Sequence, residues 1–332
     1  MIQFLSCNIK ETPLKRLCYG GSIMIEIFKF DHHKFEPIKN IEKDCWINVV
    51  KPDNIELERL SNKLNIPMDF MVDSLDIDER ARIEKDGDAV LVILRIPIVN
   101  VNNYKIPFIT MPVGIVFVDN IVLTICSLNI NTILDLSSNR KNMIPKTAIE
   151  LFLSCFSHAT LLYLKYLKEI NKKSIETEVA LHGAMKNEEL LQLLDIEKSL
   201  VFFTTSLRSN EFMMERVKKS GMIPMNEEEK ELFDDIMIDN KQALETANIY
   251  SNILSGMMDA FASVISNNLN VVMKILTSIT IILMIPTLVA SVYGMNIKVP
   301  FQNSPHAFLI VMGISGLLSV AGVVVFINRK WF

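Results

Sequence analysis

The residues from Asn270 to Asn296 read NVVMKILTSITIILMIPTLVASVYGMN, and they decide the fold because most of the stretch is apolar and uncharged. No charged residue occurs from Ile275 to Ile297, nor in a second stretch from Ala307 to Ile327. A helix needs roughly 20 apolar residues to cross a bilayer. We therefore predict two transmembrane helices, over residues 275–296 and 307–328; two buried helices of a soluble protein are the competing interpretation.

Basic residues give the predicted orientation of these two helices. Lys274 precedes the first helix and Arg329 and Lys330 follow the second, whereas the connecting loop, residues 297–306, holds only Lys298. Because Lys and Arg are in excess on the cytoplasmic side, both ends of the chain are predicted to be cytoplasmic, including a basic tail over residues 329–332. We expect a multi-pass protein of the inner (cytoplasmic) cell membrane.

The composition predicts a soluble body attached to this small membrane part. The chain has 332 residues, of which half are hydrophobic and 22% are charged. A formal net charge of -4 without a basic cluster argues against a nucleic-acid partner. The five cysteines are scattered without a C-x-x-C pair, and the adjacent His32 and His33 would point to opposite faces of a strand, so neither predicts a metal site.

The first half of the chain is predicted to be an α+β cytoplasmic domain over residues 24–145, after an uncertain N-terminal extension over residues 1–23. The runs CWINVV and AVLVILRI are typical of strands, and a hairpin turn is expected at Asp119 and Asn120. An amphipathic helix is expected after Pro52 and Asp53, with an apolar face made by Ile55, Leu60 and Leu64.

The second half is predicted to be helical. Residues 146–224 form a helical hairpin region that ends at the break SGMIP, and residues 225–274 form a stalk helix. If one helix runs from Asn226 to Tyr293, it is about 100 Å long at 1.5 Å per residue. Because no globular core can enclose such a rod, it requires partner helices.

Polar and sulfur-containing side chains of the first span fall on one helical face, which we call the polar stripe. Its members step by four or three residues: Met273, Thr277, Thr280, Met284, Thr287 and Ser291. This spacing is the seam period of helical bundles, so the face is expected to meet copies of itself around an axis. The hydroxyls favour a wettable pore, although small polar seams also occur in simple helix packing.

The sequence SVYGMN closes the first span. Tyr293 suits the aromatic belt at a membrane interface, and Gly294 is expected to end the helix in a left-handed turn. The amide oxygen of Asn296 would lie at the mouth of the pore. A ring of such amides suits a hydrated divalent ion, above all Mg²⁺, which sheds its water reluctantly.

These residues resemble the CorA family of divalent-cation channels, whose members end in two spans with a Gly-Met-Asn signature closing the first. The resemblance implies a funnel-shaped homopentamer with long stalk helices, no enzyme activity and no organic cofactor. It implies a selectivity ring of Gly294, Met295 and Asn296. The pore positions that it implies are Asn270, Met273, Leu276, Thr280, Met284, Thr287 and Asn296, of which Met273, Leu276 and Met284 would form hydrophobic constrictions.

The resemblance also implies that cytosolic Mg²⁺ regulates the channel by binding between neighbouring soluble domains. Asp235 matches the family's carboxylate on the stalk, with Asp234 and Asp239 nearby. For Asp234 and Asp239, a solvated acidic helix face is an equal alternative.

The sequence departs from the family pattern in two places. Ile285 separates Met284 from Pro286, which leaves the position of the helix kink open. The outer loop carries Lys298 where magnesium channels commonly have an acidic residue, which leaves the ion preference open. The expected function is passive Mg²⁺ influx, with Co²⁺ and Ni²⁺ as further ions. A transporter of Zn²⁺ or another transition metal, proton-coupled or not, is the alternative; a membrane-anchored enzyme is disfavoured because residues 1–220 show no catalytic motif.

Overall fold

The structure is a computed structural model that describes residues 24–30, 35–101, 105–129, 145–184, 187–296, 299–301 and 305–329. The predictions for residues 1–23, His32, His33, Lys298 and Lys330 lie outside the described residues. The chain divides into two compact units, Met1–Ser255 and Gly256–Phe332.

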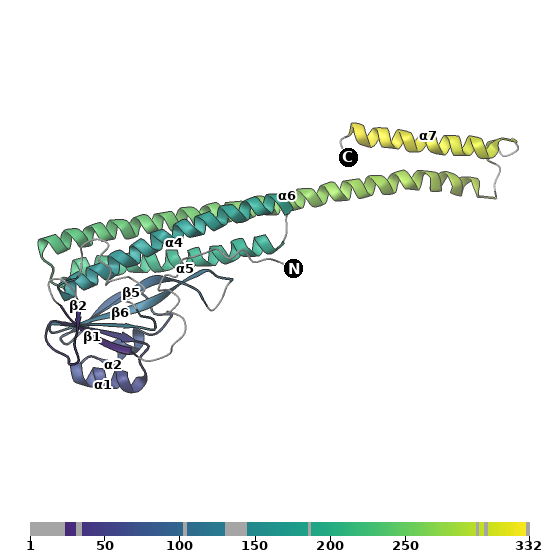
Figure 1. The fold of residues 1–332 in the computed structure, drawn as a ribbon. Helices are drawn as coiled ribbons and strands as arrows, with labels where there is room; N and C mark the ends of the chain where they lie inside the picture. Colours follow the sequence, from purple (N-terminus) through teal and green to yellow (C-terminus); the bar gives the residue numbers. More distant parts are fainter. Residues whose placement is uncertain are drawn as a thin grey trace. The chain divides into compact units, whose positions relative to one another are not determined.

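The first unit is built on a seven-stranded sheet in the order β2-β1-β3-β7-β6-β5-β4 (Figure 1). The strands are β1 (Met24–Phe30), β2 (Phe35–Pro37), β3 (Cys45–Val50), β4 (Arg82–Asp86), β5 (Ala89–Val99), β6 (Phe108–Val118) and β7 (Ile121–Cys126). All neighbours are antiparallel except β3 and β7, which pair in parallel with Cys45 opposite Ile121. The predicted α+β domain is therefore confirmed.

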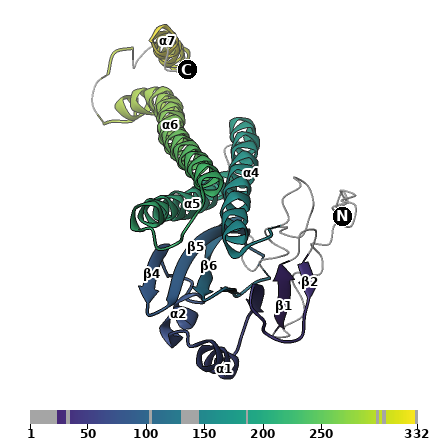
Figure 2. The same ribbon diagram turned by 90° about the vertical axis from the view of Figure 1, so that its left-hand side faces the viewer.

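Helices cover both faces of this sheet. The short helices α1 (Asn54–Leu64) and α2 (Met68–Asp73) lie on one face, and α4 (Ala148–Ala184) and α5 (Asn187–Ser220) lie on the other (Figure 2). Successive residues of β5 alternate between the two cores: Leu91 and Ile93 face α1 and α2, whereas Val92 and Leu94 face α4 and α5. Burial on both faces explains why β5 reads as a continuous apolar run.

Local sequence signals account for the ends of several elements. The expected turn at Asp119 and Asn120 joins β6 to β7, and Asp119 takes the left-handed conformation, with φ 48°. The helix α1 begins at a capping box, in which the Asp53 carboxylate accepts from the Glu56 amide at 2.8 Å. The expectation that Ile55 faces the core is wrong, because Ile55 lies in the first turn and is exposed; Leu57 and Leu60 are buried instead.

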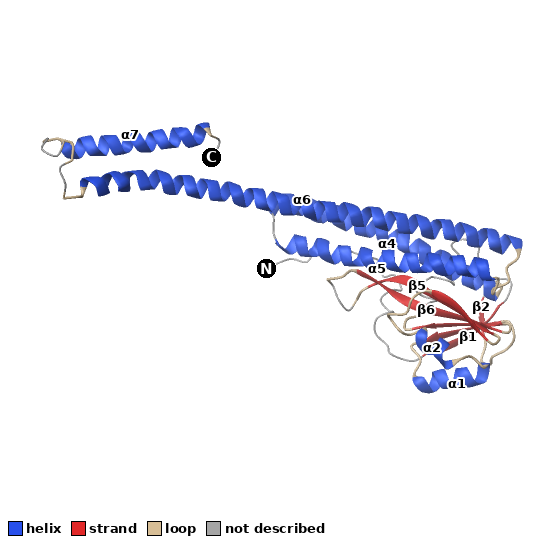
Figure 3. Cartoon of the chain, turned by 180° about the vertical axis from the view of Figure 1, so that it is seen from behind, coloured by secondary structure: helices blue, strands red, loops and turns tan. Residues whose placement is uncertain are grey.

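The helical half of the chain contains α4, α5, α6 (Glu227–Tyr293) and α7 (Ala307–Asn328). Helix α5 runs back alongside α4 and ends at Ser220, before Gly221 with φ 62° (Figure 3). Asn226 caps α6 reciprocally: its side chain accepts from the Glu229 amide, and the Glu229 carboxylate accepts from the Asn226 amide, both at 2.8 Å. One helix therefore runs from the charged residues of α6 into the apolar stretch, as predicted.

The close approach of α2 to β6 depends on a glycine. An added Cβ at Gly114 would lie 1.8 Å from the Ser74 Oγ and 2.4 Å from its Cβ, and the Ser74 hydroxyl is held by a hydrogen bond of 2.6 Å to the Phe70 carbonyl. Only a residue without a side chain lets the end of α2 pack against the sheet here.

We predict that Gly114→Ala lowers the stability of the soluble unit by about 1–3 kcal/mol, because an overpacked core must shift backbone. Thermal unfolding of the full-length protein in detergent, followed by circular dichroism, measures the change. The control is Gly256→Ala, where an added Cβ meets no atom within 4 Å. Ser74→Gly combined with Gly114→Ala should restore part of the loss; no recovery would contradict this account of the contact.

Candidate functional site

The polar stripe lies on an exposed face of α6. All six of its residues are exposed in the single chain, and so are Asn270 and Leu276, which the family resemblance added. Met284 retains 59% of its accessible surface and Leu276 retains 57%. These side chains are therefore left uncovered by the chain to which they belong.

A different face of α6 is less exposed and contacts α7, and we call it the α7-facing seam. Its residues are Ile275, Ser278, Ile282, Ile285, Val289 and Tyr293. Ser278 is fully buried, and the Ile285 Cδ1 lies 3.3 Å from the position that a Cβ on Gly322 would take. On α7, Ser315 is buried as well. Small residues are common where helices pack in membranes.

The two faces lie on opposite sides of the helix. An α-helix turns by about 100° per residue, so the centre of the polar stripe and the centre of the α7-facing seam are about 165° apart. Helix α7 therefore packs behind the polar stripe. The sequence predicted the stripe but not the seam; Ser278, a small residue on a face of isoleucines, is the signal that could have found it.

Several hydroxyl groups in the apolar part of α6 donate hydrogen bonds to backbone carbonyls of the same helix. Thr280 and Thr287 donate to the carbonyls of Leu276 and Leu283, at 2.8 and 3.3 Å. A hydroxyl whose hydrogen is donated in this way presents only lone pairs outward. The exposed oxygens of Thr280 and Thr287 are therefore acceptors, which suits contact with a cation or with its bound water.

The end of α6 differs from the sequence expectation. Gly294 does not take a left-handed conformation; among the described glycines, positive φ values occur at Gly87 and Gly221. The chain instead leaves the helix with Gly294 N donating to the Ala290 carbonyl at 2.9 Å, and a Cβ on Gly294 would lie 3.3 Å from that same oxygen. Met295 and Asn296 follow Gly294 on the surface.

Pro286 lies inside α6, two residues after Met284. Because proline has no amide hydrogen, the carbonyl of Ile282 loses its usual partner four residues later. The helix nevertheless continues to Tyr293. The free carbonyl belongs to a residue of the α7-facing seam, so it is on the side away from the polar stripe.

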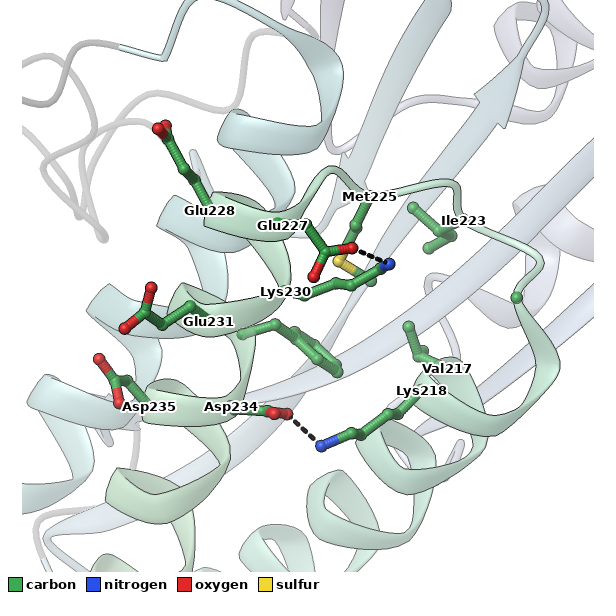
Figure 4. Close-up of a pocket in the computed structure, with 12 residues that line it drawn as sticks. Val217, Lys218, Ile223, Met225, Glu227, Glu228, Lys230, Glu231, Asp234 and Asp235 are labelled. Atoms are coloured by element: carbon green, nitrogen blue, oxygen red, sulfur yellow. Dashed lines mark hydrogen bonds and ion pairs between the residues drawn. The ribbon is translucent and has the colours of Figure 1, made fainter.

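The predicted regulatory residues lie at the start of α6, beside a cavity of about 650 Å³ at the α5–α6 turn (Figure 4). The three aspartates are not equivalent. Asp234 accepts from the Lys218 ammonium at 2.5 Å, and this ion pair leaves it partly neutralised. Asp235 and Asp239 are exposed, and no ion pair is recorded for either within the described part of the chain.

Two further carboxylates share the face of Asp235. Glu228 and Glu231 are exposed and point the same way as Asp235, away from Lys218 and Lys230 (Figure 4). Their spacing of three and four residues puts them on one helical face, and this spacing could have revealed them from the sequence. Like charges at this spacing destabilise a helix unless a cation lies near them. No group of three or more metal-ligating side chains suited to one ion occurs among the described residues of the single chain.

The family model described as "CorA-like Mg2+ transporter protein" matches residues 42–329, which include the strands β3 to β7 and the helices α6 and α7. The chain belongs to the CorA-like Mg²⁺ transporter family. One relative of this chain is the cobalt/magnesium transport protein CorA of Methanocaldococcus jannaschii. The two sequences are 28% identical, over 91% of this chain and 95% of that protein. The protein of the same name from Thermotoga maritima is 24% identical over 97% of each chain.

A solved structure supports the fold over the same length. The complete structure of the CorA magnesium transporter from Methanocaldococcus jannaschii has a TM-score of 0.82, with 27% identity, and covers 94% of this chain and 99% of that one. The predicted order of an α+β domain, a long helix and two apolar C-terminal helices is therefore confirmed. The described part of the chain has two helices that are long and apolar enough to cross a membrane, α6 and α7.

We predict that Gly322→Leu weakens the contact between α6 and α7, because the new side chain would collide with Ile285. The matched control is Gly316→Leu on the same helix, where an added Cβ meets no atom within 4 Å. Thermal unfolding of the purified protein in detergent should show a lower transition temperature for Gly322→Leu alone. Equal loss in both variants would mean that α7 packs through a different face.

Proposed function

We propose that this protein is a channel for passive uptake of Mg²⁺, assembled from five copies around an axis lined by the polar stripe. One observation carries the proposal: α7 covers one side of α6, while the stripe on the opposite side is uncovered and carries outward-facing hydroxyl oxygens. Lipid offers no hydrogen-bond partners to the polar groups of such a face. Identical faces from neighbouring subunits, arranged around a water-filled axis, would provide them. Five copies, rather than another number, follow from the family resemblance.

In this assembly the ion passes through a selectivity ring and then through narrower apolar sections. The amides of Asn296, with Gly294 and Met295, would form the ring at the outer mouth, where a Mg²⁺ ion can keep its water shell. Met273, Leu276 and Met284 are exposed on α6 and would form apolar constrictions that stop ions when they are dry. Thr280 and Thr287 would supply acceptors for the bound water between them.

The membrane potential is sufficient to drive this uptake. An inside-negative potential contributes about 2.3 kcal/mol per charge per 100 mV, and a divalent ion gains twice this amount. No nucleotide hydrolysis is required in this mechanism. The protein would lie in the cytoplasmic membrane with both ends inside, and Co²⁺ and Ni²⁺ would be further transported ions.

Regulation by cytosolic Mg²⁺ would use the face of Asp235. The carboxylates of Glu228, Glu231 and Asp235 repel one another at the start of α6, and a cation held between this face and a neighbouring subunit would relieve that repulsion. Mg²⁺ that binds only the closed arrangement shifts the population towards it. When cytosolic Mg²⁺ falls, the subunits separate and the pore opens.

Replacing Asn296 by Ala tests the selectivity ring. We expect loss of Mg²⁺ uptake by at least about tenfold, since the removed amide would be missing from every subunit around the mouth. Uptake is measured in proteoliposomes with an inside-negative potential. The control is Asn328→Ala, at the other end of the second span, which should transport normally. Unchanged uptake by Asn296→Ala would rule out the ring.

The same proteoliposomes distinguish the alternative cargo. Competition by Zn²⁺, Co²⁺ and Ni²⁺, each with and without a pH gradient, reports which ion is preferred and whether protons are coupled. Stronger transport of Zn²⁺ than of Mg²⁺, driven by the pH gradient, would replace Mg²⁺ uptake by proton-coupled zinc transport.

Replacing Asp235 by Asn tests the regulatory site. We expect a higher Mg²⁺ concentration on the cytoplasmic side to be needed to close the channel, because one carboxylate per subunit is lost from the cation site. The control is Asp234→Asn, whose carboxylate already pairs with Lys218 and should leave the Mg²⁺ dependence unchanged. Flux is measured against graded Mg²⁺. If both variants behave like the wild type, Mg²⁺ does not act through this face.

A further inference from the structure

A second cavity of the soluble unit is lined by an earlier part of α5 than the cavity at the α5–α6 turn, and its charged residues differ. It has a volume of about 730 Å³ and is lined by the segment after α2, by β5 and β6, and by residues of α5 and α6. Three arginines contribute to its wall, Arg80, Arg95 and Arg208, against a single carboxylate, Asp78. Asp76 and Glu79 also act on Arg95 from nearby, so the excess of positive charge is a property of the cavity lining alone.

Arg95 forms the floor of this cavity and keeps its charge without an ion pair. Its Nε donates to the Ser206 hydroxyl, its Nη1 to the carbonyls of Ile77 and Glu79, and its Nη2 to the carbonyl and hydroxyl of Thr110. All five N–H groups thus meet neutral acceptors. Burial lowers the pKa of Arg95, but a guanidinium remains charged at any physiological pH. No salt bridge to Arg95 is recorded among the described residues.

The other two arginines are free to bind a ligand. Arg80 and Arg208 are exposed, and no ion pair or hydrogen bond of either guanidinium is recorded within the described ranges. Arg80 comes from the segment after α2 and Arg208 from α5, so the two reach the cavity from different elements. A guanidinium with unused donors is the side chain best suited to bidentate contact with a phosphate group.

Apolar rings lie beside these charges. Phe202 and Phe212 also line the cavity from α5, and they expose 41% and 65% of their surface. Asn248 reaches the same cavity from α6 and offers an amide that can both donate and accept. A simple phosphate ion would make no contact with an aromatic ring of the cavity, whereas a ligand with a planar aromatic group would pack against it.

We propose that this cavity binds a nucleoside polyphosphate, with its phosphates on Arg80 and Arg208 and its base against Phe212, one helical turn from Arg208 on α5. The volume lies within the usual range for sites of small organic ligands. The hydroxyls of Thr205 and Ser209, which also line the cavity, add hydrogen-bonding groups for the sugar. The inference does not depend on the proposed pore, because every residue it uses belongs to the soluble unit. Mg²⁺ in proteins is often held by nucleotide phosphates. A nucleotide site would therefore let a Mg²⁺ transporter respond to the concentration of the nucleotides that bind Mg²⁺ in the cell.

Binding to the full-length protein in detergent tests the proposal. The probe is ATP without Mg²⁺, measured by isothermal titration calorimetry, and the comparison ligand is inorganic tripolyphosphate. We expect saturable binding of ATP, weakened at least about tenfold by Arg208→Gln or Arg80→Gln, because each removes a charge-assisted contact. The control is Arg59→Gln, an exposed arginine of α1 on the opposite face of the sheet, which should bind as the wild type does.

The role of the rings is tested separately. Phe212→Ala should weaken binding of ATP while leaving the binding of tripolyphosphate unchanged, since only the base contacts the ring. Equal binding of both ligands, unaffected by Phe212→Ala, would overturn the assignment of a nucleoside. Absence of saturable ATP binding to the wild type would overturn the proposal. Arginine variants that change the mass of the assembly but not ATP binding would instead mean that the two arginines contact another copy of the chain. Each variant is first checked for an unchanged melting temperature.

Discussion

The arrangement of the membrane part depends on the two opposite faces of α6. A single apolar helix gives no direction to the assembly, because lipid can cover all of its sides equally well. Here α7 lies on one side of α6, at Ile285 and Gly322, and the opposite side carries the threonines and methionines of the polar stripe. Exposed apolar residues such as Leu283 and Leu288 lie between the two. This asymmetry distinguishes the side of α6 that its own chain covers from the sides that it leaves exposed.

A proline lies within the apolar part of α6, and the helix continues past it to Tyr293. Because proline has no amide hydrogen, the carbonyl of Ile282, four residues earlier, loses its usual partner. Hydroxyl groups on both sides bond back to the helix: Thr280 and Thr287 on the uncovered side, and Ser278 on the side that α7 approaches. These polar side chains are therefore satisfied within α6 itself on either side.

Sequence patterns predicted those elements whose cause is local. The turn at Asp119 and Asn120, the start of α6 at Asn226 and the periodic polar stripe all depend on residues within one or two helical turns, and all can be read from the printed sequence. Features set by distant partners were missed or misread. Ile55 was expected on the buried face of α1, but the buried residues begin two positions later, at Leu57. Gly294 was expected in a left-handed turn, which it does not adopt. The cavity around Arg95 joins residues more than 100 positions apart, so no local pattern reveals it.

The parallel pairing of β3 with β7 sets the order in which the newly made chain can fold. The residues of β3 leave the ribosome with no neighbour on that side until β7 follows, and the face beneath α4 and α5 is closed only when Phe233 and Ile236 of α6 have been made. At about 5–20 residues per second, this exposes apolar strands for many seconds. The apolar parts of α6 and α7 come last in the chain, so the strands have all been made before the residues that would anchor them to the bilayer leave the ribosome.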